Sequence, residues 1–226
     1  IAFKDYSIGQ SFFAGKWIGL RHFVSFVNDP YFFRLMKNTF LLGFYDLLWG
    51  FPLPIIFALL LNEMKANKFK GAVQTISYLP YFISTVIIVG MMFSILSIDG
   101  VVNTFLSNFG IKPVLFFSEP GWFRTLYVAS GIWQGLGWNS IIYLAAISGI
   151  NPELYESAKI DGASRFRQAV SITVPCIIPT ISILLIMKIG SVLNISFEKV
   201  YLLYSPSTYE TADIIGTYVY RRGFLS

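Results

Sequence analysis

Two long segments of this chain contain no charged residue, and they restrict its fold more than any other feature. One runs from Ala72 to Ile98 and the other from Thr125 to Ile150. About 20 apolar residues in a helix are enough to cross the hydrocarbon core of a membrane. Charged residues make up 13% of the chain, whereas soluble domains contain about 25%. The sequence therefore predicts a membrane protein.

The apolar runs predict four membrane-spanning helices, at about 39–61, 72–98, 125–150 and 176–197. Asp46 is the one charge in the first, and Pro52 and Pro54 should kink it because proline removes a backbone donor. Pro80 marks a bend in the second helix. The predicted fold class is an all-α, polytopic bundle of transmembrane helices.

Basic residues give a partial signal for orientation. The short connection between the first two spans carries Lys65, Lys68 and Lys70, and such clusters favour the cytoplasmic side. Five basic residues before the first span would then lie outside: Lys4, Lys16, Arg21, Arg34 and Lys37. Charge alone therefore favours the cytoplasmic side for this connection, although the signal is not clean. The net charge is +5, but the basic residues form no single stripe, so we expect no binding of nucleic acid.

Groups that perform catalysis or bind metals are scarce. The chain has one histidine, His22, and one cysteine, Cys176, which excludes a zinc-binding HExxH motif and a cysteine cluster. It has no GxxxxGK[ST] phosphate-binding loop. Asp46 is the only acid well inside a predicted span, whereas proton-coupled transporters usually carry more. If the protein moves a solute uphill, the energy must come from elsewhere.

A charged segment, residues 151–175, separates the last two apolar runs. Asn151 can cap free amide groups, and Pro152 suits the first position of a helix. We expect a short helix to about residue 161, ended by Gly162 in the left-handed conformation. A second short helix should follow, from about residue 164 to about residue 175. On spacing alone, a surface elbow and an ordinary solvated loop are equally good interpretations.

The residues of this segment favour the elbow. Glu156-Ser157-Ala158, then Gly162, then ITVP at 172–175 resemble the "EAA" loop of ATP-binding-cassette importer permeases, whose pattern is E-A-A, three residues, G, nine residues, I-x-L-P. Ser157 and Val174 depart from the pattern. Other segments resemble the subfamily for uptake of oligosaccharides and polysaccharide fragments: NTFLL, FPLPIIFALLLNE, FKGAVQTISYLPYFIS, GWNSIIYLAAISGI and TYVYRRG.

The resemblance implies the fold of a type I ATP-binding-cassette importer permease, a multi-pass protein of the bacterial cytoplasmic membrane. It implies six spans, about four of them complete here, so that the chain is incomplete at both ends. The whole chain, 1–226, would be one permease domain. Residues 1–37 would be mainly extracytoplasmic or interfacial, and 38–226 would form the core with a cytoplasmic coupling loop at 151–175. The lysine-rich connection would then lie inside.

The resemblance also implies the partners and the coupling residues. A second homologous permease, two ATPase subunits that bind ATP and Mg, an extracytoplasmic solute-binding protein and a sugar or oligosaccharide are expected. This chain would be a transport subunit embedded in lipid, neither an enzyme nor the holder of a cofactor or metal. The residues that contact the ATPase would be Glu156, Ser157, Ala158, Asp161, Gly162 and Ala163. The main alternative is a self-sufficient secondary transporter or channel; an integral membrane enzyme has almost no candidate residues.

Residues of the solute path are predicted from the chemistry of sugar binding, which combines aromatic faces with amides and acids. The candidates are Gln134, Trp138, Asn139, Lys188 and Asn194. Asn194 should share a helical face with Glu198 at the outer end of the fourth span. Lys188, near the middle of that span, should line a cavity, pair with an acid of a partner subunit or reach the interface. Tryptophan also gathers at membrane interfaces, and amides also join helices, so both alternatives stay open.

Overall fold

The computed structural model describes residues 2–5, 11, 15–64 and 66–224, so Lys65 lies outside the described residues. In the described part, the strands are β1 (Lys4–Asp5) and β2 (Lys16–Trp17), which pair antiparallel. Helices form nearly all of the remaining regular structure. The predicted all-α class is confirmed.

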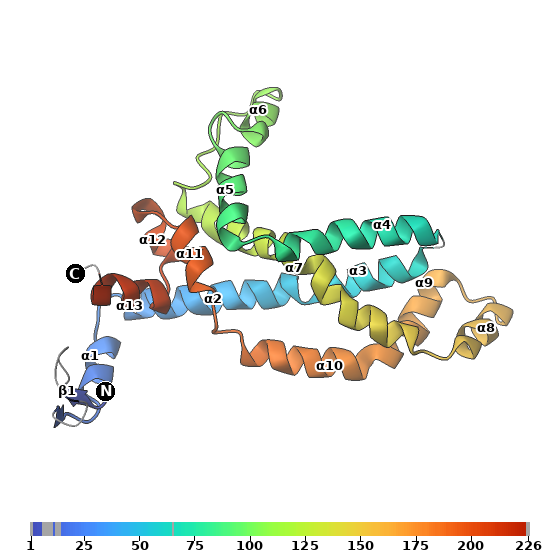
Figure 1. Cartoon of the computed structure of the whole chain (residues 1–226), viewed down its shortest axis with the longest axis horizontal. Helices are drawn as coiled ribbons and strands as arrows, with labels where there is room; N and C mark the ends of the chain where they lie inside the picture. Colours follow the sequence, from blue (N-terminus) through green and yellow to red (C-terminus); the bar gives the residue numbers. More distant parts are fainter. Residues whose placement is uncertain (1, 6–10, 12–14, 65, 225–226) are drawn as a thin grey trace.

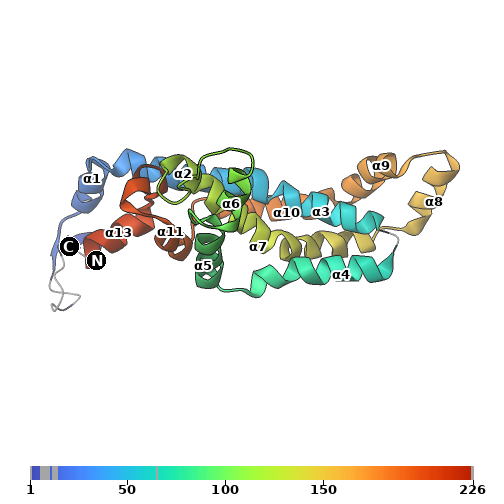
Figure 2. The ribbon, with the colours of Figure 1, turned by 90° about the horizontal axis from the view of Figure 1, so that it is seen from above.

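Long helices lie side by side along the longest axis of the molecule (Figure 1). α2 (Phe32–Gly50) and α3 (Pro52–Glu63) follow one another, and α4 (Asn67–Tyr78) returns in the opposite direction. α7 (Pro120–Ser148) packs against α2, α3, α4 and α10 (Val174–Gly190), so it is the central helix of the bundle. We call the two ends of this axis the α8 end and the α13 end (Figures 1 and 2).

The number of spans agrees only approximately with the sequence. Three helical segments of the described chain are both long and apolar enough to cross a membrane, at 32–63, 85–107 and 165–190. α7 is outside this set although it has 29 residues and is therefore about 43 Å long. Its uncharged polar residues and glycines lower its hydropathy, and it reaches spanning length without the composition of the other three.

The first predicted span is confirmed and is longer than expected. Helical backbone dihedrals at Phe51 (φ −83°, ψ −47°) join α2 to α3. The expected kink is only an interruption in the hydrogen-bond pattern, because Pro52 and Pro54 occupy the first turn of α3, where a missing N–H costs little. The two helices keep one general direction (Figure 1).

The second predicted span, 72–98, is not one helix. It divides into α4, the 3₁₀ turn η1 (Leu79–Phe82), which contains Pro80, and α5 (Thr85–Leu96). Ser84 caps α5 by accepting a hydrogen bond from the backbone of Ile87. The bend at Pro80 is thus confirmed, and it is large enough for α5 and α6 (Val101–Ser107) to leave the long axis (Figure 1).

The fourth predicted span, 176–197, is displaced along the chain. The helical segment begins at α9 (Arg165–Gln168), passes through the π turn η2 (Ala169–Thr173) and ends with α10 at Gly190. The prediction that a helix ends near Pro175 is wrong. The helix continues because the wider π turn before Pro175 accommodates a residue that has no backbone N–H to donate. Asn194 lies in the loop that follows, so it shares no helical face with Glu198 of α11 (Phe197–Leu203).

The remaining elements gather at the α13 end, near both termini (Figure 1): α1 (Arg21–Val27), η3 (Pro206–Thr208), α12 (Tyr209–Ala212) and α13 (Ile215–Phe224). α11 connects them to the bundle by packing against α5, α7 and α13. One buried cluster, which includes Leu42, Phe123 and Val200, supports this half. A second, of Ala58, Tyr143, Ile147 and Ile177, lies toward the α8 end.

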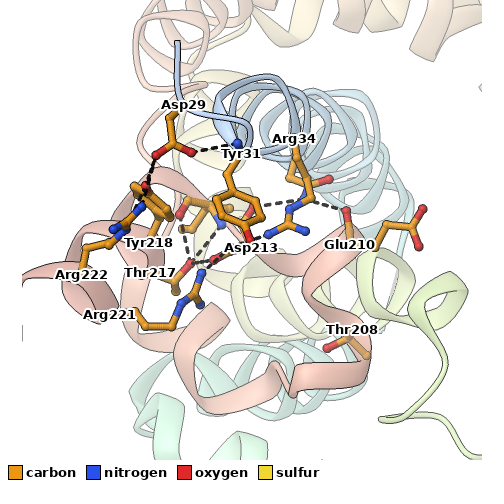
Figure 3. A network of polar contacts seen from close by, with 12 residues as sticks. Asp29, Tyr31, Arg34, Thr208, Glu210, Asp213, Thr217, Tyr218, Arg221 and Arg222 are labelled. Carbon is orange, nitrogen blue, oxygen red and sulfur yellow. Dashed lines mark hydrogen bonds and ion pairs between the residues drawn. The ribbon is translucent and has the colours of Figure 1, made fainter. Parts of the chain in front are cut away.

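A buried polar network fastens α12 and α13 to the bundle (Figure 3). The Asp213 side chain is 0% exposed and pairs with Arg221 at 2.6 Å and with Arg34 at 3.4 Å. Asn38 of α2 donates to the backbone oxygen of Asp213, and Arg124 of α7 donates to Asn38. The Asp213 carboxylate therefore joins α2 to α13, and Asn38 links α7 to the same residue.

A smaller cluster lies beside it, before the start of α2. The Tyr218 hydroxyl donates to Asp29 at 2.5 Å, and Arg222 pairs with the same carboxylate at 3.5 Å (Figure 3). The hydrogen bond from Tyr218, followed by that from the Tyr31 amide, holds the pKa of Asp29 below its usual value. Asp29 thus joins α13 to the turn that precedes α2.

Candidate functional site

The segment 151–168, which we call the elbow, forms the α8 end of the molecule (Figure 1). Its first helix, α8 (Pro152–Ile160), begins where the sequence predicts, with the Asn151 side chain accepting from the Glu153 amide at 3.1 Å. Asn151 satisfies a free donor of the first turn, and Glu153 lies favourably at the positive end of the helix dipole. The local sequence therefore specifies this start.

Gly162 ends α8 in the left-handed conformation, as predicted, with φ of 76°. The amide of Ala163 donates to the Ala158 carbonyl at 2.8 Å, and the amide of Gly162 donates to the Lys159 carbonyl at 3.1 Å. This pair of bonds is a Schellman motif, which satisfies the last carbonyls of a helix and requires φ > 0 at the residue after the cap. The chain then turns into α9, which is capped by Ser164.

Side chains hold the elbow firmly against two other elements. The Tyr155 hydroxyl bonds to the Thr173 hydroxyl at 2.9 Å, which joins α8 to η2. Arg165 donates to the backbone oxygen of Glu63 at 3.1 Å and pairs with its carboxylate at 3.4 Å, which joins α9 to the end of α3. These contacts connect the elbow both to α3 and to the helix that continues into α10.

The tip of the elbow exposes two large apolar side chains that the sequence analysis missed. Ile160 is 88% exposed and Phe166 is 80% exposed. Their signal in the sequence was present but weak, because each is an apolar residue beside charges in the polar segment. Large apolar side chains exposed on a polar surface segment are typical of a protein contact.

The predicted coupling residues fall into two groups. Glu156, Ser157, Asp161 and Gly162 are exposed, whereas Ala158 and Ala163 are half-buried. The Ser157 hydroxyl donates to carbonyls of its own helix, so its side chain is already satisfied. Glu156 lines a groove of 380 Å³ between the elbow and the end of α3. All six residues lie on the elbow, and their contact with another subunit stays a prediction.

A cavity of 170 Å³ lies between α3, α7 and α10. It brings together two of the predicted solute-path residues, Asn139 and Lys188. Phe51 and Tyr143 also contribute to its wall. Its other lining residues are Gly50, Pro54, Ile142 and Leu184. An amide, an ammonium and two aromatic rings therefore face one space.

Lys188 has a partner that the sequence analysis did not assign. Its ammonium pairs with the Asp46 carboxylate at 2.5 Å, and the two side chains are 36% and 34% exposed. Lys188 lies in the last turn of α10 rather than at the middle of a span. The signal was present, since two isolated charges of opposite sign in two spans are expected to pair.

The other three candidates lie apart from this cavity. Gln134 donates to the Ile83 carbonyl at 3.1 Å and so satisfies the helix break before α5. Trp138 stacks on Tyr81 of η1 with ring centroids 4.5 Å apart. Asn194 lies exposed in the loop after α10. Gln134 and Trp138 both contact the segment around the bend at Pro80, and for Gln134 this is the helix-joining role left open above.

Comparisons with known proteins agree with these features. The family described as "Binding-protein-dependent transport system inner membrane component" matches residues 50–221. The "Polygalacturonan/rhamnogalacturonan transport system permease protein YteP" of Bacillus subtilis (strain 168) is 46% identical over 99% of this chain and 70% of its own length. "Protein LplB" of the same organism is 44% identical, with the same two shares covered.

A solved structure has the same fold. It is titled "Crystal structure of a bacterial ABC transporter involved in the import of the acidic polysaccharide alginate". Its matching chain is 50% identical and superposes with a TM-score of 0.89, over 92% of this chain and 73% of that one. A related structure with equal values contains an "alginate pentasaccharide-bound periplasmic protein".

Proposed function

The chain belongs to the inner membrane components of binding-protein-dependent transport systems, and from this membership we propose that it is the permease subunit of an ATP-driven importer of acidic oligosaccharides. The observation that carries the coupling part of the proposal is the elbow. It is rigidly held, it forms one end of the bundle, and it exposes Ile160 and Phe166.

The elbow has the properties needed to receive a movement from an ATPase. Its tip has apolar side chains that a groove on the ATPase can cover, with charged residues around them that set the orientation of docking. The hydrogen bonds of Tyr155 and Arg165 attach it to η2 and α3. A displacement of the tip therefore moves packed helices as rigid bodies, as in other transitions driven by docked domains.

This assignment also sets the orientation. The α8 end, with the lysine-rich connection after α3, faces the cytoplasm, and the α13 end faces outward. Lys68 and Lys70 then follow the rule that basic residues stay inside. The external solute-binding protein docks at the α13 end, and a second, homologous permease completes the translocation path.

The substrate class follows from the relatives and from the charges of the cavity. Polygalacturonan and alginate, for which two similar proteins are named, are polymers of acidic sugars. Lys188 places an ammonium in the cavity wall beside the Asn139 amide. We take oligosaccharides that contain uronate units as the substrates.

Uptake into vesicles tests the proposal. The complete chain is reconstituted with its second permease, ATPase and binding protein, and entry of a radiolabelled uronate trisaccharide is measured. Uptake should require three things together: the ATPase, ATP on the same side of the membrane as the ATPase, and the binding protein on the opposite side. Ion-driven uptake by this polypeptide without the ATPase would instead establish the alternative, a secondary transporter or channel.

A further inference from the structure

Three charged side chains near the outer half of the bundle leave an excess of one positive charge. Asp46 of α2 pairs with Lys188 of α10. Lys199 of α11 is only 6% exposed, and its ammonium lies 4.9 Å from the centre of the Tyr127 ring. Within the described part of the chain, no carboxylate lies within ion-pair distance of Lys199, although the charge of Asp46 acts on it through space.

The fold creates this arrangement through a close contact between α2 and the loop 191–196. A β-carbon at Gly43 would overlap the carbonyl oxygen of Val192, so only glycine permits the crossing. The loop leaves α10 just after Lys188 and enters α11 just before Lys199. In Figure 1 this loop crosses α2. The crossing has one lysine before it and one after it, and Asp46, one turn along α2 from Gly43, pairs with the first and acts on the second through its charge.

A buried ammonium without a counter-ion is costly, and a ring contact offsets only a small part of that cost. Asp46 pairs with Lys188, and its single negative charge cannot neutralise both ammoniums. A second carboxylate would complete the charge balance. The cavity wall supplies a place for it, because Lys188 faces that space together with the Asn139 amide and the rings of Phe51 and Tyr143.

We propose that this cavity is a subsite for one uronate unit, in which the substrate carboxylate binds Lys188 and displaces Asp46 toward Lys199. The inference rests on the proposed function, because it needs an acidic sugar to enter the bundle. Asn139 donates to a sugar hydroxyl, and an aromatic ring covers the apolar face of the sugar. Asp46 acts as an internal competitor, which keeps binding weak enough for the sugar to move on.

Lys188 should strengthen binding of an acidic sugar and Asp46 should weaken it, so binding measurements on variants of the two residues test the proposal. The complete importer is purified, without binding protein or ATP, and titrated with trigalacturonate and with neutral galactotriose by calorimetry. Wild type should prefer trigalacturonate. Lys188→Met should weaken trigalacturonate binding about tenfold or more, because a charge-assisted hydrogen bond is lost. Asp46→Asn should instead tighten it, because the competitor is removed.

Lys199 is tested through its dependence on Asp46. Lys199→Met alone should weaken trigalacturonate binding, because Asp46 then has no second partner and stays on Lys188. In the Asp46→Asn background, the same change should have no further effect, which a double-mutant cycle measures. Lys37→Met, which removes an exposed lysine of the same helix α2, is the control for loss of charge and should change nothing.

Several results overturn the inference. They are equal binding of both trisaccharides by wild type, wild-type affinity in Lys188→Met, weaker binding in Asp46→Asn, and additive effects in the double mutant. The same preparations are assayed for vesicle uptake. If uptake of the acidic trisaccharide needs the ATPase but Lys188→Met binds normally, the subsite is wrong and the proposed function stands. Uptake without the ATPase refutes the proposed function itself.

Discussion

Replacement of Gly162 by valine should uncouple the permease from its ATPase without affecting the bundle. Gly162 has φ of 76°, and a β-carbon there would meet no atom within 4 Å. The cost is therefore conformational and not a clash. A left-handed residue with a side chain costs about 1–2 kcal/mol, and a β-branched one lies at the upper end.

That cost is enough to change the elbow. If residue 162 leaves the left-handed region, the Ala158 and Lys159 carbonyls lose their Schellman partners. A change of 1–2 kcal/mol lowers the population of the native elbow relative to its alternatives by a factor of about 5–30. Docking of the ATPase should weaken by a similar factor, since docking first has to restore the native turn.

The assay is co-purification of the ATPase with each permease variant, together with ATP hydrolysis in reconstituted membranes. Asn tolerates the left-handed region better than Ala or Val. The loss of ATPase co-purification should therefore be smallest in Gly162→Asn, larger in Gly162→Ala and largest in Gly162→Val. Gly71→Val is the matched control, because Gly71 also has open space around its β-position but lies in α4 with negative φ.

Wild-type retention of the ATPase by all three Gly162 variants would refute the argument that the elbow angle matters. Loss in Gly162→Asn as large as in Gly162→Val would show that the left-handed backbone is not the cause. A fall in thermal stability of the whole bundle in Gly162→Val would also contradict the reasoning, because the substituted residue is exposed and touches no helix.

Three further changes test other parts of the structure. Gly137→Ala places a methyl group onto the Ser77 carbonyl and should lower stability by about 1–3 kcal/mol, seen as a lower unfolding temperature in detergent. Asp213→Asn removes the buried partner of Arg221 and should lower the same temperature by a change worth about 3 kcal/mol; wild-type stability would show that the network is dispensable. Phe166→Asp puts a charge on a side chain that is 80% exposed, so unfolding should be unchanged while ATPase co-purification falls; unchanged co-purification would exclude Phe166 from docking.

The sequence by itself determined the features that depend on near neighbours. The apolar runs predicted the membrane-spanning helices, because the free energy gained when an apolar side chain leaves water depends little on the fold that removes it. Asn151 and Gly162 predicted the start and end of α8, because a cap and a left-handed turn are made within a few residues. The bend at Pro80 was predicted for the same local reason.

Only the tertiary structure decided which distant residues meet. Lys188 and Asp46 are 142 positions apart, and the charge of Asp46 acts on Lys199 because the loop after α10 crosses α2 at Gly43. The direction taken by α5 depends on Gln134, which satisfies the broken backbone at Ile83 from another helix. Such contacts depend on helix register, on the places where backbones approach closely and on where a helix is broken. Spacing along one chain carries little information about them, because each is decided jointly by the packed neighbours.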